Sequence, residues 1–282
     1  MQQTKLSVIV CTYNREEYIG ECLAHLTNQI LDKGKFEVLL INNNSTDNTE
    51  TIIQDIIKKH RNTPFRYFVE KKQGHTFARN RGILESNGEI LSFIDDDAFV
   101  SKDYCSSIID FFERRNDVVA IGGRIIPSYE IKEPDWMSKY LLPLVAALDK
   151  GDKEIAFTGG SFPIGANMAF RKTIFDEYGI FDVELGRRGG GLEGGEEKDV
   201  FIRLKKGHEK IYFVPGVSVR HVIPPHRVEI SYVKGLAIGV GRSERKRIRK
   251  SGLKEILNKL VSESIKSAAT LVLAISYLLR AK

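Results

Sequence analysis

The chain has 282 residues and a mass of 31.9 kDa, enough for one large α/β domain or for one domain with a short appendage. Hydrophobic residues make up 42% of it and charged residues 28%, an ordinary balance that excludes a disordered chain, a collagen and a disulfide-stapled scaffold. The net charge is +6, and the segment 242–250 alone holds six basic residues and one acid, so the rest is close to neutral and does not favour nucleic acid as a partner.

The three cysteines, Cys11, Cys22 and Cys105, show neither a metal-ligand spacing nor a disulfide pattern. This favours reduced thiols and a cytoplasmic location. The polar N-terminus leads directly into a strand pattern, so we expect no signal peptide. The longest uncharged apolar stretch, residues 267–279, is shorter than a membrane-spanning helix requires.

Short apolar runs alternate with amphipathic segments through the first half of the chain. This alternation predicts an α/β fold with a Rossmann-like, mostly parallel central sheet and helices on both faces. Such a sheet binds ligands at the carboxyl ends of its strands, so the residues directly after each strand are candidate site residues. The predicted strands are 6–11, 36–41, 65–69, 90–94 and 118–126, and the predicted helices are 16–28, 49–60, 76–86 and 103–114.

The second half is less regular. We expect a loop over 127–152 with a helical piece at 136–148, a strand at 164–170, a helix at 196–206 and one or two strands within 211–221. Residues 186–195 include six glycines, and two helices are predicted at 228–250 and 253–279. The predicted organisation is a catalytic domain over 1–227, divided into a nucleotide-binding half (1–126) and an acceptor half (127–227), followed by a basic helical tail over 228–282.

Polar residues follow the first two predicted strands. Thr12, Tyr13 and Asn14 come after the first, and a cluster over 42–49 that includes Asn43 comes after the second. Such side chains can hydrogen-bond a base or a ribose, or they can simply cap the next helix. Arg79 lies near the start of a predicted helix, where an arginine suits a phosphate or a nucleotide.

Three consecutive carboxylates, Asp95, Asp96 and Asp97, end the fourth predicted strand. Like charges repel, and a divalent cation offsets that cost, so the cluster favours a metal–diphosphate site over an ordinary acidic turn. His221 ends a later strand and is a candidate third ligand.

Glu196 and Glu197 open a predicted helix directly after the glycine-rich stretch. Acids in a first helical turn are ordinary partners of the helix dipole. A carboxylate beside a glycine-rich loop is also a candidate general base.

Six motifs, taken together and in order, resemble the family 2 glycosyltransferases, which have the GT-A fold. None is decisive alone, but their order is specific for the family, and they span roughly residues 5–227. The motifs are the segments 8–15, 43–47, 78–82, 94–97, 165–171 and 195–199, the last with Arg203.

The resemblance implies inverting transfer of a sugar from a nucleotide-sugar to a hydroxyl of a glycan or lipid-linked glycan, with Mn²⁺ or Mg²⁺ on the diphosphate. It implies that Glu197 is the base, with Glu196 as the alternative, and that Asp97 is the direct metal ligand in a motif with Asp95. Together with His221, these two aspartates form the expected metal set. The expected nucleotide-sugar-binding residues are Cys11, Thr12, Tyr13, Asn14, Asn43, Arg79, Asp95, Asp96, Gly165, Ala166 and Asn167.

Two departures from the family pattern are present. Asn42 and Asn43 stand where the family often has two aspartates, which leaves UDP, GDP and TDP all open, with UDP favoured by frequency. Glu197 replaces the usual aspartate of the base position. A nucleotidyltransferase and a non-catalytic nucleotide-binding scaffold remain alternatives at this stage.

The predicted C-terminal helices form a basic, amphipathic tail. Apolar residues recur on one stripe of 253–279, next to the basic segment 242–250. This pattern predicts attachment to an anionic membrane surface through 242–279, on the inner face of the cell membrane, and hence a lipid-linked acceptor. Packing of the helix on the domain, or against a second copy in a homodimer, is the alternative.

Overall fold

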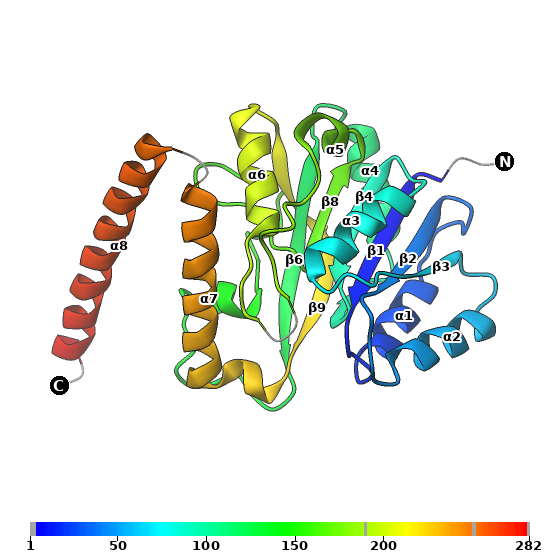
Figure 1. Cartoon of the computed structure of the whole chain (residues 1–282), viewed down its shortest axis with the longest axis horizontal. Helices are drawn as coiled ribbons and strands as arrows, with labels where there is room; N and C mark the ends of the chain where they lie inside the picture. The colour runs from blue at the N-terminus through cyan, green and yellow to red at the C-terminus, as the bar shows by residue number, and fades with distance from the viewer. Residues whose placement is uncertain (1–3, 189–190, 250–251, 281–282) are drawn as a thin grey trace.

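The computed structural model describes residues 4–188, 191–249 and 252–280, and within them one twisted sheet is flanked by helices (Figure 1). Gly189 and Gly190 of the glycine-rich stretch, Lys250 of the basic segment and the N-terminal residues 1–3 lie outside the described residues. The first half contains β1 (Leu6–Thr12), α1 (Ile19–Thr27), β2 (Phe36–Asn42), α2 (Thr49–Lys59), β3 (Phe65–Val69), α3 (His75–Glu85), β4 (Ile90–Asp95), β5 (Ala98–Val100), α4 (Tyr104–Arg114) and β6 (Ala120–Tyr129).

The second half continues the same sheet. It contains two short 3-10 turns, η1 and η2, of which η1 spans Leu142–Val145 and η2 spans Pro225–Val228. The remaining elements are β7 (Ile155–Ala156), β8 (Asn167–Arg171), α5 (Thr173–Tyr178), α6 (Glu196–Lys206), β9 (Ile211–Ile223), α7 (Ile230–Arg249) and α8 (Leu253–Arg280).

The strand order is β3-β2-β1-β4-β8-β6-β9-β5, with β7 paired to β9. Strands β3, β2, β1 and β4 run parallel, as the alternating sequence pattern predicts, and β8 is inserted antiparallel between β4 and β6. The predicted α/β class with a Rossmann-like sheet is therefore confirmed. Because β1, β2 and β4 are parallel neighbours, their carboxyl ends, with the polar residues that follow, meet at one edge of the sheet.

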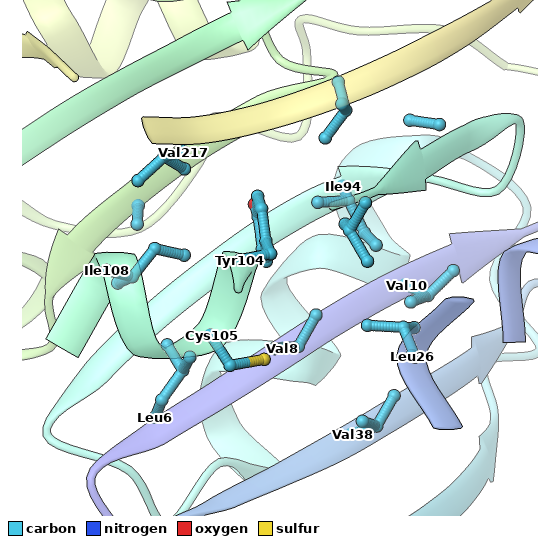
Figure 2. Close-up of a cluster of buried hydrophobic side chains, with 14 of the residues drawn as sticks. Leu6, Val8, Val10, Leu26, Val38, Ile94, Tyr104, Cys105, Ile108 and Val217 are labelled. Atoms are coloured by element: carbon cyan, nitrogen blue, oxygen red, sulfur yellow. The ribbon is translucent and has the colours of Figure 1, made fainter. Parts of the chain in front are cut away.

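Both faces of the sheet are covered. On one face, side chains of α1, α2 and α4 pack against the sheet, and Figure 2 shows Leu26 of α1 between Val10 and Val38 and Cys105 of α4 beside Val8. On the other face, α3 covers β1 and β2, while α5 and α6 pack over β4 and β8, with Phe93 of β4 among a group of aromatic rings. Burial on both sides explains why the strands are apolar at nearly every position.

Asn167 joins the two halves of the sheet from within the core. Its side chain is fully buried, accepts a hydrogen bond from the Tyr104 hydroxyl (3.0 Å) and donates to the carbonyls of Arg124 (3.0 Å) and Val217 (2.9 Å). A Cβ at Gly123 would lie 2.2 Å from the Asn167 amide nitrogen, so only glycine fits beside it. These contacts use the whole amide to connect β8, β6, β9 and α4.

Several predicted elements differ from those observed. The helical piece expected at 136–148 is reduced to η1, and the residues of 211–221 form one strand, β9, which continues to Ile223. Strands β5 and β7 and helix α5, which the sequence did not predict, have three, two and six residues. Elements this short carry too few residues for a periodic pattern to be visible.

The two C-terminal helices differ in their relation to the body. Leu236, Gly239 and Ser243 of α7 are buried against it, whereas α8 stands apart in Figure 1. The segment Ile256–Leu279 of α8 is long and apolar enough to cross a membrane by length and composition, and none of its most apolar window is buried. The uncharged stretch 267–279 was expected to be too short to span a membrane. The helix is longer than that stretch, because it continues through the charged residues that precede residue 267.

Candidate active site

A cavity of about 560 Å³ lies at the carboxyl edge of the parallel strands. Cys11 and Thr12 at the end of β1 and Tyr13 directly after it line the cavity, together with Asp95, which ends β4, and Asp96 and Asp97, which follow it. The segments around Gly165 and Glu196 form one side, and α7 closes another. The cavity thus lies where the topology predicts a ligand, with walls from both halves of the chain.

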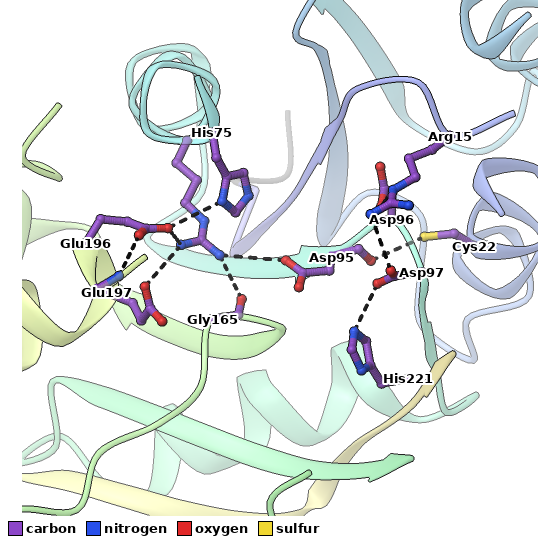
Figure 3. Close-up of polar contacts among 12 residues, drawn as sticks. Arg15, Cys22, His75, Asp95, Asp96, Asp97, Gly165, Glu196, Glu197 and His221 are labelled. Carbon is purple, nitrogen blue, oxygen red and sulfur yellow. Dashed lines mark hydrogen bonds and ion pairs between the residues drawn. The ribbon is translucent and has the colours of Figure 1, made fainter. Parts of the chain in front are cut away.

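The acidic cluster at the end of β4 faces a histidine on β9. Nε2 of His221 lies 3.1 Å from Oδ1 of Asp97, while Arg227 donates a hydrogen bond of 3.0 Å to Oδ2 (Figure 3 shows Asp97 and His221). Ligand atoms of Asp95, Asp97 and His221 all lie within 4.8 Å of one another. Strand β9 brings His221 there because it pairs with β5, in a register that places His221 opposite Ala98.

The pKa values of the neighbouring residues Asp96 and Asp97 are shifted in opposite directions. Burial alone would raise the pKa of Asp97, but the charges of His221 and Arg227 outweigh it and hold that pKa well below its usual value. Burial raises the pKa of Asp96 to about 7; Arg15 opposes the shift, and the charge of Asp97 adds to it. Burial would lower the pKa of His221, yet Asp97 raises it. Asp97 is therefore the carboxylate kept ionised.

A second charged cluster surrounds the guanidinium of Arg79, which is 3% exposed. Its Nη1 donates to Oε1 of Glu196 (2.8 Å), and its Nη2 donates to the carbonyl of Gly165 (3.1 Å) and lies 3.7 Å from Asp95. Nδ1 of His75 lies 3.3 Å from the same oxygen of Glu196 (Figure 3). Arg79 thus connects the β4 aspartates to the acids that open α6.

Glu196 and Glu197 are adjacent but have different surroundings. Burial alone would raise the pKa of Glu196, but the hydrogen bond from His75 and the charge of Arg79 lower it well below its usual value. Glu197 is 23% exposed in its side chain and lies 4.0 Å from Arg79. Burial and the charge of Glu196 raise the pKa of Glu197 to about 8. Glu196 is held as a structural anion, and Glu197 is the carboxyl available to the cavity.

Most of the sequence-predicted site residues line this cavity, but two do not. Asn14 is exposed, and its Oδ1 accepts a hydrogen bond from the amide of Thr46 (2.8 Å), connecting the loops after β1 and β2. Asn167 lies in the core, where its amide is used entirely by protein groups. The predicted residues that do line the cavity are Cys11, Thr12, Tyr13, Asn43, Arg79, Asp95, Asp96, Asp97, Gly165, Ala166, Glu196, Glu197 and His221.

Asn43 borders the cavity but is occupied by the backbone of the following loop. Its Nδ2 donates to the carbonyls of Glu70 (3.0 Å) and Lys72 (2.8 Å), and its Oδ1 accepts from the amide of Gly74 (2.8 Å). Oγ1 of Thr12, in contrast, is buried and has no hydrogen-bond partner within the described part of the chain. Asn43 therefore shapes the edge of the cavity, while Thr12 presents an unused polar atom to it.

Sequence reasoning missed several cavity residues. Arg15 is the last residue of the first motif and lies 3.4 Å from Asp96, so its charge next to a polar strand end was a usable signal. His75, Arg227 and the α7 residues gave no local signal, because their partners are far away in the chain. Only the tertiary structure brings them to the site.

Comparisons with known proteins agree on one family. The model described as Glycosyl transferase family 2 matches residues 7–179. A Haloferax volcanii protein, glucosyl-dolichyl phosphate glucuronosyltransferase, is 26% identical over 251 residues, which cover 86% of this chain and 76% of that protein. A Methanococcus voltae dolichyl N-acetyl-alpha-D-glucosaminyl phosphate 3-beta-D-2,3-diacetamido-2,3-dideoxy-beta-D-glucuronosyltransferase is 30% identical over 256 residues, covering 84% of this chain and 74% of that protein.

Solved structures show the same fold. TarS from S. aureus, in complex with UDP-GlcNAc, superposes with a TM-score of 0.60 at 20% identity. The mannosyltransferase PcManGT from Pyrobaculum calidifontis, in complex with GDP-Man and Mn²⁺, superposes with a TM-score of 0.59 at 19% identity. Each covers 78% of this chain, and the aligned parts are 59% and 57% of those two chains.

The raised pKa of Glu197 predicts a pH-dependent stability. Between its ordinary value of 4.5 and about 8, the folded protein keeps this proton and the unfolded chain releases it. The free energy of unfolding therefore falls as pH rises through that window, and Glu197→Gln removes this contribution. Urea titrations in EDTA should show the variant gaining stability over the wild type from pH 5 to pH 9. A constant difference would contradict the raised pKa, and Glu89→Gln, at an exposed site, is the control.

Proposed function

The chain belongs to glycosyl transferase family 2, and on that premise we propose that it transfers a sugar, with inversion, from a nucleotide-sugar to a hydroxyl of a glycan or lipid-linked glycan. One observation carries the proposal: a single cavity holds an acidic metal-type cluster and a separate carboxylate, Glu197, connected through Arg79. We take a UDP-sugar as the favoured donor, and the panel of nucleotides below tests that choice.

Two relatives support a lipid-linked acceptor. Their names give dolichyl phosphate-linked sugars as the molecules on which they act, and each aligns with more than four fifths of this chain. The exposed apolar helix α8 also fits a lipid-linked acceptor, because it would hold the enzyme at the membrane surface where such an acceptor resides.

Asp95, Asp97 and His221 fit a divalent cation, Mn²⁺ or Mg²⁺. Oδ1 of Asp97 is buried and lies 3.1 Å from Nε2 of His221, so two potential ligand atoms face each other there. Carboxylate oxygens are preferred ligands of these ions. Nδ1 of His221 lies 3.3 Å from the carbonyl of Val145, which orients Nε2 toward Asp97, the arrangement usual for a metal-ligating histidine. When bound, the ion supplies a Lewis acid for the leaving diphosphate.

The proposed reaction is one in-line displacement. The acceptor oxygen forms a bond to the anomeric carbon, the bond from that carbon to the phosphate oxygen breaks, and Glu197 takes the hydroxyl proton. Glu197 is suited to this role because it faces the cavity and because its pKa of about 8 makes its ionised form, the form that acts, a stronger base than an ordinary carboxylate. Glu196 is not, because Arg79 and His75 occupy its carboxylate.

We also propose that the catalytic unit extends through α7 and that only α8 forms a separate tail. Residues Leu236, Ser243 and Arg247 of α7 line the cavity, so a boundary at residue 227 would remove one of its walls. The exposed side of the α7 C-terminus, with Arg242 and Arg245, together with α8, forms the surface proposed to contact an anionic membrane on its cytoplasmic face.

Nucleotide binding should depend on the metal. Calorimetry with UDP, GDP and TDP should give at least about tenfold tighter binding of the matching nucleotide with Mn²⁺ than with EDTA, because the cation screens the diphosphate from the aspartates. Asp97→Ala should remove the difference. Equal affinities with and without Mn²⁺ in the wild type would rule out the metal role, and Asp103→Ala, outside the cavity, is the control.

Glu197 should carry the base function. With a panel of nucleotide-sugars and an oligosaccharide or lipid-linked acceptor, Glu197→Gln should lower kcat by about 10²-fold or more and leave the nucleotide Kd within about twofold, because it retains the shape and loses the basicity. If only Glu196→Gln has this effect, Glu196 is the base instead. No transfer or donor hydrolysis by the wild type with any donor would refute the proposed function itself.

The tail should bind anionic membranes without contributing to the fold. Removing residues 253–282 should abolish co-sedimentation with phosphatidylglycerol vesicles and leave the Tm nearly unchanged, because α8 is exposed. Leu260→Glu with Leu271→Glu should weaken vesicle binding, whereas Thr270→Glu, exposed on the side of the helix that carries Lys259, Glu263 and Lys266, should not. A large drop in Tm after truncation, with a full-length protein that ignores vesicles, would make α8 a structural helix.

A further inference from the structure

The loop that leads into the start of α6, where Glu197 lies, is open around its last two glycines. Residues 191–195 include Gly191, Gly194 and Gly195, and a Cβ at Gly194 or Gly195 would meet no atom within 4 Å. Gly195 also has a φ of 117°, a conformation that other residues rarely adopt. A loop so open and so rich in glycine needs restraint from outside to hold a carboxylate in one place.

Helix α7 supplies contacts along this loop from one face. Its buried residues are Leu236, Gly239 and Ser243, spaced three and four apart as expected for one side of a helix. A Cβ at Gly239 would lie 2.3 Å from the carbonyl oxygen of Leu192, so the loop backbone lies directly on the helix. Oγ of Ser243, which is 4% exposed, accepts a hydrogen bond of 3.2 Å from the amide of Gly194.

Helix α7 makes a third contact, with Lys198, the residue that follows the proposed base. Glu244 of α7 accepts a hydrogen bond of 2.9 Å from Lys198, the residue after Glu197, and one of 2.9 Å from Lys259 of α8. The contacts at Leu192, Gly194 and Lys198 therefore bracket Glu196 and Glu197 in the sequence.

We propose that α7 positions the loop that leads into α6, with Gly239 and Ser243 as positioning residues for Glu197 at the start of that helix. The proposal rests on the proposed function of Glu197. Neither residue takes part in the proton transfer; each acts through the backbone of residues 192–194. Displacing a catalytic group by about 1 Å can reduce turnover about 10²-fold. A Cβ added at Gly239 would lie 2.3 Å from the carbonyl oxygen of Leu192, so the loop backbone would have to shift to accommodate it.

Helix α7 offers a matched pair of substitutions. Gly239→Ala and Gly241→Ala make the same chemical change in the same helix and raise helix propensity equally, by about 1 kcal/mol. A Cβ at Gly241 meets nothing within 4 Å, whereas one at Gly239 meets the loop backbone. Any difference between the two variants therefore reports the contact with residues 192–193.

The expected result is a separation of turnover from nucleotide binding. Gly239→Ala should lower kcat for nucleotide-sugar hydrolysis or transfer by at least about 10-fold and speed amide exchange over 191–198, while the Kd for the best-bound nucleoside diphosphate with Mn²⁺ stays within about twofold. Gly241→Ala should change none of these. Ser243→Ala should speed exchange at Gly194 and lower kcat by a few-fold without a change in Kd.

Three outcomes would overturn the proposal. They are an unchanged kcat in both Gly239→Ala and Ser243→Ala, equal losses in Gly239→Ala and Gly241→Ala, or a loss of nucleotide affinity parallel to the loss of kcat. If Gly239→Ala does not fold, Ser243→Ala decides by the same criteria. Glu197→Gln measured in parallel separates the two hypotheses, because full activity in that variant refutes the base assignment while the exchange data still test the α7 contact.

Discussion

The site depends on one buried guanidinium. Arg79 lies among carboxylates at the cavity that would otherwise repel one another: Glu196 at 2.8 Å, Asp95 at 3.7 Å and Glu197 at 4.0 Å. An uncompensated buried charge is costly, so removal of this cation would leave the β4 edge and the start of α6 unable to approach each other. The pair Arg79–Glu196 spans 117 residues of sequence, and it therefore joins the first half of the chain to the second.

The same principle gives neighbouring acids different protonation. At the end of β4, His221 and Arg227 keep Asp97 ionised, and burial favours the proton on Asp96. At the start of α6, His75 and Arg79 keep Glu196 ionised, and its charge favours the proton on Glu197. Two adjacent carboxyls with opposite shifts can perform two tasks, one electrostatic and one involving proton transfer. The two clusters lie at different walls of one cavity, as Figure 3 shows for Asp97 and Glu196.

Most of the fold could be predicted from the sequence, because buried parallel strands and amphipathic helices leave strong periodic patterns. The location of the site also followed, since parallel topology places the residues after β1, β2 and β4 at one edge. What could not be predicted depends on distant partners. Asn167 carries a family motif yet is used in the core, because Tyr104 and two carbonyls consume its amide. Arg227 reaches Asp97 across 130 residues, a pairing that no local pattern encodes.

The placement of the three cysteines has a practical consequence. Cys22 of α1 and Cys105 of α4 are fully buried, whereas Cys11 borders the cavity. Burial raises the pKa of Cys11 to about 12 and that of Cys22 well above its usual value, so these thiols stay neutral and unreactive in the folded protein. The rate at which a thiol reagent modifies Cys22 and Cys105 consequently measures how often the core opens. Modification of Cys11 measures in addition how often the cavity lining around β1 becomes accessible. The three native cysteines can therefore report local opening without any introduced label site.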